Sequence, residues 1–113
     1  MKKIAALLIL CMAVMVTSCS SDDGPTEPVD TTVTYDGEIK LLMDDYCLSC
    51  HLDPPVNGAP ISLTTFDEVK DAVEIKDLIA RIANGTMPPG NLPKLSDEEV
   101  QLVRDWQAGN FQE

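Results

Sequence analysis

Two cysteines and the only histidine of the chain stand within five consecutive residues, Cys47-Leu48-Ser49-Cys50-His51. Because the 113 residues include a single histidine, any site that requires two histidines from one chain is excluded. The part of the sequence with enough apolar residues to fold is residues 35–113, and a domain of about 79 residues has a core of marginal stability. This cluster is therefore the first place to look for an additional stabilising element.

The spacing of the three side chains matches the C-x-x-C-H pattern of covalent haem attachment. At a helix end, two cysteines three positions apart reach the two vinyl groups on one edge of a porphyrin. The histidine that follows then lies beneath the ring and presents a nitrogen to the iron. Cys47 and Cys50 are therefore predicted to attach one haem c, with His51 as an axial ligand.

Three other interpretations of the cluster are less favoured. A structural zinc site uses four ligands, usually in two separated pairs, and no fourth Cys or His remains once residues 1–19 are set aside. A thioredoxin-like redox pair would lie beside a strand–helix–strand pattern, which this sequence lacks. A disulfide between Cys47 and Cys50 would close a very small, strained loop and leave His51 without a role.

The second axial ligand has to come from another residue type, and the folding segment contains two methionines. Met43 precedes Cys47 by four residues on the same helix face, so we expect it to pack on the side of His51. Met87 lies in a turn whose prolines restrict the backbone, which lowers the entropic cost of holding its thioether at the iron. The predicted metal ligands are His51 and Met87. The alternative for Met87 is a core methionine that anchors its loop.

The periodicity of apolar residues predicts an all-α fold of four short helices, with no alternating strand pattern of useful length. The expected helices span residues 37–48, 66–73, 75–83 and 97–108. Capping boxes are expected where Thr65 precedes Glu68 and Ser96 precedes Glu99, and stop signals at Asn84-Gly85 and Gly109. The expected apolar stripes are Ile39, Leu42, Met43 and Tyr46; Ile75, Leu78, Ile79 and Ile82; and Val100, Val103 and Trp106.

Taken together, the Cys47–His51 motif, the late Thr86-Met87-Pro88-Pro89 turn and the closing Trp106-Gln107-Ala108-Gly109 resemble a small monohaem class I c-type cytochrome. The resemblance covers about residues 37–110. It implies the cytochrome c fold, in which about four short helices wrap around one covalently bound haem and the first and last helices cross. The family often has a Gly-Pro carbonyl that accepts a hydrogen bond from the axial histidine. Here Gly58-Ala59-Pro60 stands instead, so the partner of His51 stays open.

Residues 1–18 carry two lysines followed by an apolar run, which is typical of a signal peptide and too short for a stable membrane span. The run ends in Val16-Thr17-Ser18-Cys19, which resembles the lipobox of bacterial lipoproteins and implies cleavage before Cys19 and lipidation of its sulfur. The alternative is an ordinary signal peptide with a chance cysteine. Residues 19–34 are then a lipidated cysteine with an acidic, flexible tether, and residues 35–113 are the cytochrome c domain. We expect an exported lipoprotein on the periplasmic or cell-surface side, and Ser20 is compatible with the outer membrane.

Ligation by His51 and Met87 fills both axial positions, so neither a substrate nor oxygen reaches the iron without displacing a ligand. We therefore expect an electron carrier that cycles between Fe(III) and Fe(II), without a substrate-turnover site. One alternative is a haem-based sensor or peroxidase-like protein in which Met87 dissociates. Another is an electron-relay subunit of a larger oxidoreductase complex.

The chain is strongly acidic, with 19 Asp and Glu against 8 Lys and Arg and a formal net charge of −11. This balance argues against nucleic acid as a partner and favours redox proteins with basic docking patches. The acids of the predicted helices are most simply solvated, with a docking surface as the alternative: Asp44, Asp45, Asp67, Glu68, Asp71, Glu74 and Asp77. Arg81 is expected on a solvated helix face, with a contact to a haem propionate as the alternative. Trp106 is expected in the core, with a position lining the haem as the alternative.

Overall fold

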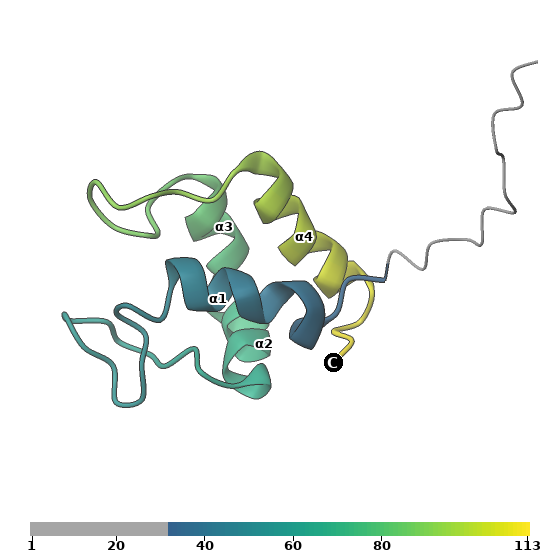
Figure 1. Cartoon of the computed structure of the whole chain (residues 1–113), viewed down its shortest axis with the longest axis horizontal. Coiled ribbons are helices and arrows are strands. Elements are labelled where there is room, and N and C mark those ends of the chain that lie inside the picture. Colours follow the sequence, from purple (N-terminus) through teal and green to yellow (C-terminus); the bar gives the residue numbers. More distant parts are fainter. Residues whose placement is uncertain (1–31) are drawn as a thin grey trace, which may run out of the picture.

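The computed structural model describes residues 32–113. The predicted signal peptide at 1–18, the lipidated Cys19 and residues 20–31 of the predicted tether lie outside the described residues. Within 32–113 the chain forms η1 (Tyr35–Ile39), α1 (Lys40–Tyr46), α2 (Phe66–Ile75), α3 (Leu78–Ala83) and α4 (Asp97–Ala108) (Figure 1). These residues contain no strand beyond one isolated bridge between Thr34 and Gln112, so the predicted all-α class is confirmed. No helix in this range is both long enough and apolar enough to cross a membrane.

The first helix begins at Tyr35, two residues earlier than predicted, because Thr34 caps it. The Thr34 hydroxyl accepts a hydrogen bond from the Gly37 N–H at 3.0 Å, and the Glu38 carboxylate accepts one from the Thr34 N–H at 2.9 Å. These bonds satisfy N–H groups that a helix start otherwise leaves unpaired. Thr34, assigned from the sequence to the end of the tether, is thus part of the folded unit.

The same helix ends at Tyr46, and its predicted extension to Leu48 was wrong. The N–H groups of Cys47 and Leu48 both donate to the carbonyl of Met43, at 2.9 and 3.0 Å. This shared acceptor closes the helix and starts the turn that carries the cysteines.

The core lies between η1, α1 and α4, where η1 packs against α4, and α2 completes it with Val69, Ala72 and Val73 (Figure 1). Trp106 of α4 has no exposed surface, and its ring centroid is 5.9 Å from that of Tyr35 and 5.7 Å from that of Phe66. Ile39, Leu42 and Met43 of the predicted first stripe are buried, as are Val100, Val103 and Trp106 of the fourth. The predicted core role of Trp106 and packing role of Met43 are confirmed.

Helices α2 and α4 start where the sequence predicts. Both capping boxes form, with Thr65 and Glu68 at α2 and Ser96 and Glu99 at α4. α4 also ends at the predicted Ala108.

The boundary between the second and third helices was placed wrongly. α2 continues to Ile75 and α3 begins only at Leu78, because Asp77 adopts a left-handed backbone with φ of 56°. Ile75, expected on the buried face of the third helix, is instead 68% exposed at the end of α2.

The two stop signals behave differently. Gly85 adopts the predicted left-handed conformation with φ of 73°. Gly109 does not, and the positive φ angles fall on Asn110 and Phe111 instead. This turn brings the Phe111 ring onto Trp106, with 4.8 Å between centroids, so the last residues belong to the core side of the domain.

Candidate functional site

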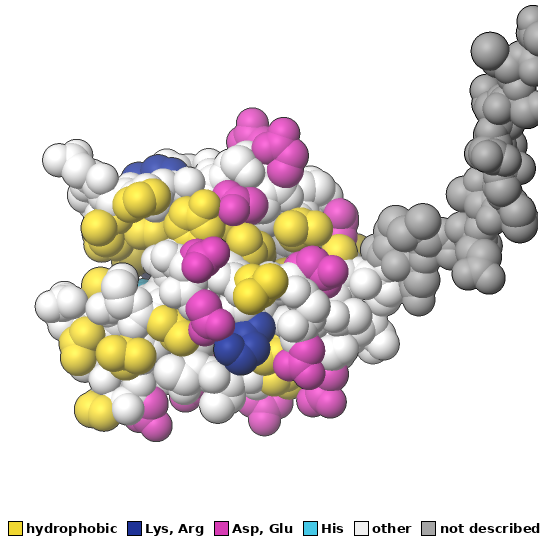
Figure 2. Space-filling view, viewed as in Figure 1, with side chains coloured by type: hydrophobic (Ala, Val, Ile, Leu, Met, Phe, Trp, Pro, Cys, Tyr) yellow, Lys and Arg dark blue, Asp and Glu magenta, His cyan; other side chains and the backbone are white. Residues whose placement is uncertain are grey.

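A cavity of about 330 Å³ lies apart from Trp106 and the aromatic rings around it, since none of Tyr35, Phe66, Trp106 and Phe111 lines it. Its wall is formed by the turn after α1, the chain from Pro60 to Leu63, the α2–α3 junction and the loop after α3. Most of the lining is apolar. In Figure 2, apolar side chains are most prominent at the left-hand end, where the loops of Figure 1 project. The structure brings Cys47, Cys50, His51 and Met87, 40 residues apart in sequence at the extremes, to this one cavity.

The two cysteines are placed by the turn that follows α1. The N–H groups of Cys50 and His51 both donate to the carbonyl of Cys47, at 3.1 and 3.0 Å, so the motif forms one tight turn. Both thiols are free and partly buried. Asn57 reaches back across the turn, with its side-chain nitrogen 3.7 Å from the Cys50 sulfur and 3.4 Å from the Ser49 carbonyl oxygen.

Burial raises the pKa of the Cys47 thiol to about 11. At neutral pH this thiol is therefore protonated. Reactive redox cysteines have the opposite property, a pKa lowered toward or below neutrality. The thioredoxin-like interpretation of Cys47 and Cys50 gains no support from this environment.

His51 is held in a defined orientation by a backbone carbonyl. Its Nδ1 lies 2.8 Å from the carbonyl oxygen of Ile61, and its own carbonyl accepts from the Leu63 N–H at 2.9 Å. Because a carbonyl oxygen only accepts hydrogen bonds, Nδ1 carries the proton of the neutral ring. Nε2 is then left with a lone pair, which is the arrangement that metal-binding histidines adopt. The partner that the sequence left open is the carbonyl of Ile61, directly after Pro60.

Met87 is partly buried and lines the same cavity. Its N–H donates to the carbonyl of Arg81 at 3.1 Å, which folds the loop back onto α3. The Thr86 hydroxyl donates to the same carbonyl at 3.2 Å. On the far side, the Lys94 ammonium donates to the carbonyl of Pro88, which is itself buried. Met87 is therefore fixed from both sides of its turn.

Met43 takes no part in the cavity. It is 1% exposed and belongs to the core cluster. Of the two methionines considered as ligands, only Met87 lines the cavity with His51.

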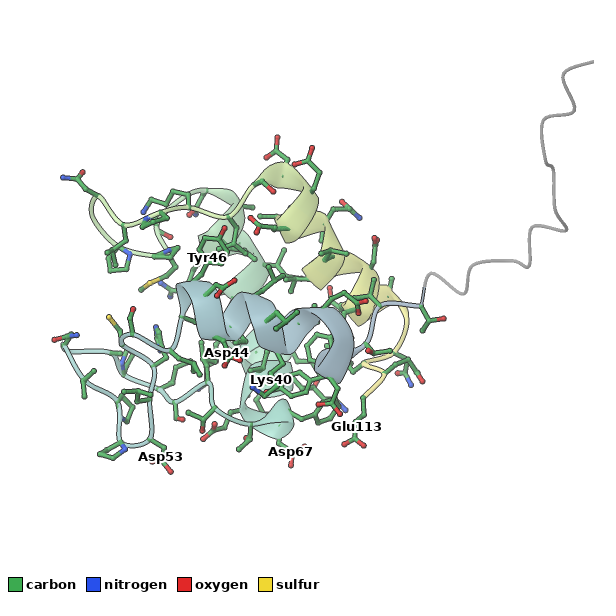
Figure 3. All side chains as sticks on the ribbon, in the orientation of Figure 1. Lys40, Asp44, Tyr46, Asp53, Asp67 and Glu113 are labelled. Carbon is green, nitrogen blue, oxygen red and sulfur yellow. The ribbon has the colours of Figure 1, made fainter. Side chains whose placement is uncertain are left out.

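Two contacts of the site were not predicted from the sequence. Tyr46 directly precedes Cys47 in sequence, and its hydroxyl lies 3.0 and 3.2 Å from the two carboxylate oxygens of Glu99 on α4. Figure 3 shows Tyr46 reaching from the end of α1 toward the upper helices. The Ile61 carbonyl was also missed. No sequence pattern indicates either contact. Tyr46 and Glu99 are 53 residues apart, and the contact of His51 uses a backbone carbonyl, which every residue has.

Charged side chains line the cavity only at the α2–α3 junction, where Lys76, Asp77 and Arg81 stand. Elsewhere, the exposed Asp44 forms an ion pair with Lys40 at 2.8 Å (Figure 3). Glu68 serves α2 as a cap: burial alone would raise its pKa, but hydrogen bonds from Thr64, Ser62 and Thr65 outweigh this and lower it.

Within residues 32–113, no three side chains among His, Cys, Asp and Glu gather as ligands of one metal ion, so the zinc interpretation gains no support. Comparison of the chain with protein-family models, with curated proteins and with solved structures finds no match. The resemblance to class I c-type cytochromes therefore stays a prediction from the motifs.

Proposed function

We propose that this chain is a monohaem c-type electron carrier, with Cys47 and Cys50 as attachment residues and His51 and Met87 as axial ligands. The observation that carries the proposal is that one largely apolar cavity is lined by all four of these residues. Three of them lie within five consecutive residues, but Met87 comes from a separate loop, and its presence is not required by the motif.

The chemistry of these residues fits a haem. A thiol adds across a vinyl group: its sulfur bonds to one vinyl carbon and its proton moves to the other, with no oxidant or reductant needed. Cys47 and Cys50 are both free and both line the cavity wall, where their sulfurs could form these bonds. The Ile61 carbonyl fixes the His51 ring so that Nε2 is free to bind iron.

A haem bound by these residues supplies one-electron exchange between Fe(III) and Fe(II). The protein's part would be to hold the iron through His51 and Met87. His51 is oriented by its hydrogen bond to Ile61, and the Met87 loop is fixed by its bonds to Arg81 and Lys94. Such a site has no position for a substrate, so the chain is proposed to be a carrier and not an enzyme.

The location of the protein and the charge of its partners are proposed from the sequence. Lipidation at Cys19 and a tether to residue 34 would keep the domain near a membrane on the periplasmic or cell-surface side, at a high effective concentration for its redox partners. Residues 35–113 contain 15 acidic and 6 basic side chains. We expect partners with basic patches, and electron-transfer rates that fall as ionic strength rises. Rates independent of salt would contradict this.

The test is to express the chain with its export signal in a host that matures c-type cytochromes. Wild type is expected to gain the mass of one haem and to keep it under denaturing conditions. Cys47→Ser with Cys50→Ser is expected to abolish covalent attachment. A mature chain without haem would refute the proposal.

The axial ligand is tested by a matched pair, Met87→Leu and Met43→Leu, because both replacements conserve volume. Only Met87→Leu is expected to remove the weak long-wavelength absorption band of Met-ligated ferric haem. If neither variant changes the spectrum, Met87 is not the ligand. Rapid binding of carbon monoxide to reduced wild type would instead favour the sensor or peroxidase-like alternative, since it requires an open axial position.

A further inference from the structure

Half of the domain's six basic residues stand at or beside the cavity, although the domain as a whole is acidic. Lys76 and Arg81 line it, and Lys94 donates to the carbonyl of the lining residue Pro88. Asp77 is the one acidic side chain in the lining. The lining therefore carries a net charge of +1, in a domain with 15 acids.

Within residues 32–113, neither Lys76 nor Arg81 forms an ion pair. The ion pair in this range joins Lys40 and Asp44. This is notable because Asp77 is adjacent to Lys76 in sequence and lines the same cavity. The cations have a local acid available to them, yet their charged groups remain unpaired.

The Arg81 guanidinium is held from one side only. Its Nε donates to the carbonyl of Lys76 at 3.3 Å, while its terminal nitrogens have no acceptor among the described residues. This single bond ties the guanidinium to the backbone of the α2–α3 junction. The terminal nitrogens are the pair that matches the two oxygens of a carboxylate.

Arg81 also contributes its backbone to the site, because its carbonyl accepts the N–H of Met87. The cationic edge and the proposed iron ligand are thus joined through one residue. Replacing the side chain leaves this backbone bond in place, so the side chain can be tested separately.

We propose that Arg81 and Lys76 form the carboxylate-binding edge of the cavity, where they hold the propionate groups of the bound haem. The inference rests on the proposed function for the identity of the occupant. Arg81 is the directional partner through its planar guanidinium, and Lys76 adds a point charge beside it. The sequence favoured a solvated helix face for Arg81 over a haem propionate, and in the folded chain the side chain is exposed and also lines the cavity.

The test uses the mature, haem-loaded chain with ¹³C at the haem carboxyl carbons, and follows each carboxyl by NMR through a pH titration of the reduced protein. In wild type, at least one carboxyl is expected to titrate well below the pH of an unpaired carboxyl. Arg81→Gln is expected to decrease the acid dissociation constant of that haem carboxyl about tenfold. The reason is that a neighbouring opposite charge lowers a carboxyl pKa by about one unit or more. Lys76→Gln is expected to give a smaller decrease, and Arg81→Lys to retain part of the wild-type behaviour.

Arg104→Gln is the matched control, because Arg104 is an exposed cation of α4 outside the cavity lining. It removes the same charge and is expected to leave both titrations unchanged. The inference is overturned if Arg81→Gln and Lys76→Gln leave the carboxyls unchanged, or if Arg104→Gln shifts them equally. A mature chain that carries no haem would contradict the proposed function itself, which separates the two failures.

Discussion

At the crossing of η1 and α1 with α4, side chains fill the interior, whereas beside the Cys47–His51 turn they surround a cavity. Four of the five largest fully buried side chains belong to these helices, namely Ile39, Met43, Val103 and Trp106, and the fifth is Val69 of α2. None of the five lines that cavity. The crossing is completed by the chain's own residues. The cavity end has apolar walls and no filling side chain, so protein packing alone stabilises the two ends unequally.

The largest effect is expected when Trp106 is removed from the filled end. Its ring contacts Tyr35, Phe66 and Phe111, and its Nε1 donates to the Gln112 carbonyl at 2.7 Å. Trp106→Ala should lower the free energy of unfolding by about 3–5 kcal/mol, measured by urea denaturation with far-UV circular dichroism. Leu41→Ala, at a residue that is 60% exposed, is the control. Equal losses in the two variants would show that the crossing is not the main source of stability.

The same substitution, isoleucine to alanine, can be made at both ends of the domain. Ile39 is fully buried at the crossing, and Ile82 is buried on the cavity wall. Ile39→Ala and Ile82→Ala should each lower the free energy of unfolding of the haem-loaded chain by about 2–5 kcal/mol. Only Ile82→Ala should alter the haem absorption and visible circular dichroism. Identical spectra in both variants would mean that Ile82 does not border the haem.

Tyr46 connects the two ends, because it lines the cavity and bonds to Glu99 of α4. Tyr46→Phe removes this hydrogen bond to a charged acceptor and should lower the free energy of unfolding, measured by urea denaturation, by less than the core substitutions do. Tyr35→Phe is the control, because it removes a tyrosine hydroxyl from the filled end. A Tyr46→Phe variant as stable as wild type would show that the contact adds nothing in solution.

The smallest effect is a pH dependence at the start of α4. Hydrogen bonding by the Ser96 N–H, with further bonds from Tyr46 and the Ser96 hydroxyl, lowers the pKa of Glu99 despite the opposing effect of burial. Because the folded-state pKa is lower than the unfolded one, the stabilisation is complete above the ordinary glutamate pKa of 4.5 and is lost as pH falls through the folded-state value. Thermal unfolding between neutral and acidic pH should therefore show a smaller acid loss in Glu99→Gln than in the exposed Glu98→Gln. An equal loss in both would contradict the assignment.

Local signals in the sequence predicted most of the helices. The Thr65–Glu68 and Ser96–Glu99 capping boxes fixed two helix starts because they involve residues three apart. Two predicted helix boundaries were wrong. The first helix ends at Tyr46 because two N–H groups share one carbonyl there. The break between α2 and α3 falls at Asp77 because that residue has a left-handed backbone. Neither feature has a residue pattern of its own.

The candidate site divides along the same line. The chemistry of the site follows from residue types and spacing: two thiols and one imidazole close together, and a methionine in a proline-restrained turn. Only the tertiary structure decided that Met87 shares a cavity with His51, that the Ile61 carbonyl orients the imidazole, and that Lys76 and Arg81 face the cavity unpaired. The physical reason is that residue type fixes what a side chain can bind, whereas backbone carbonyls and long-range packing fix which side chains meet.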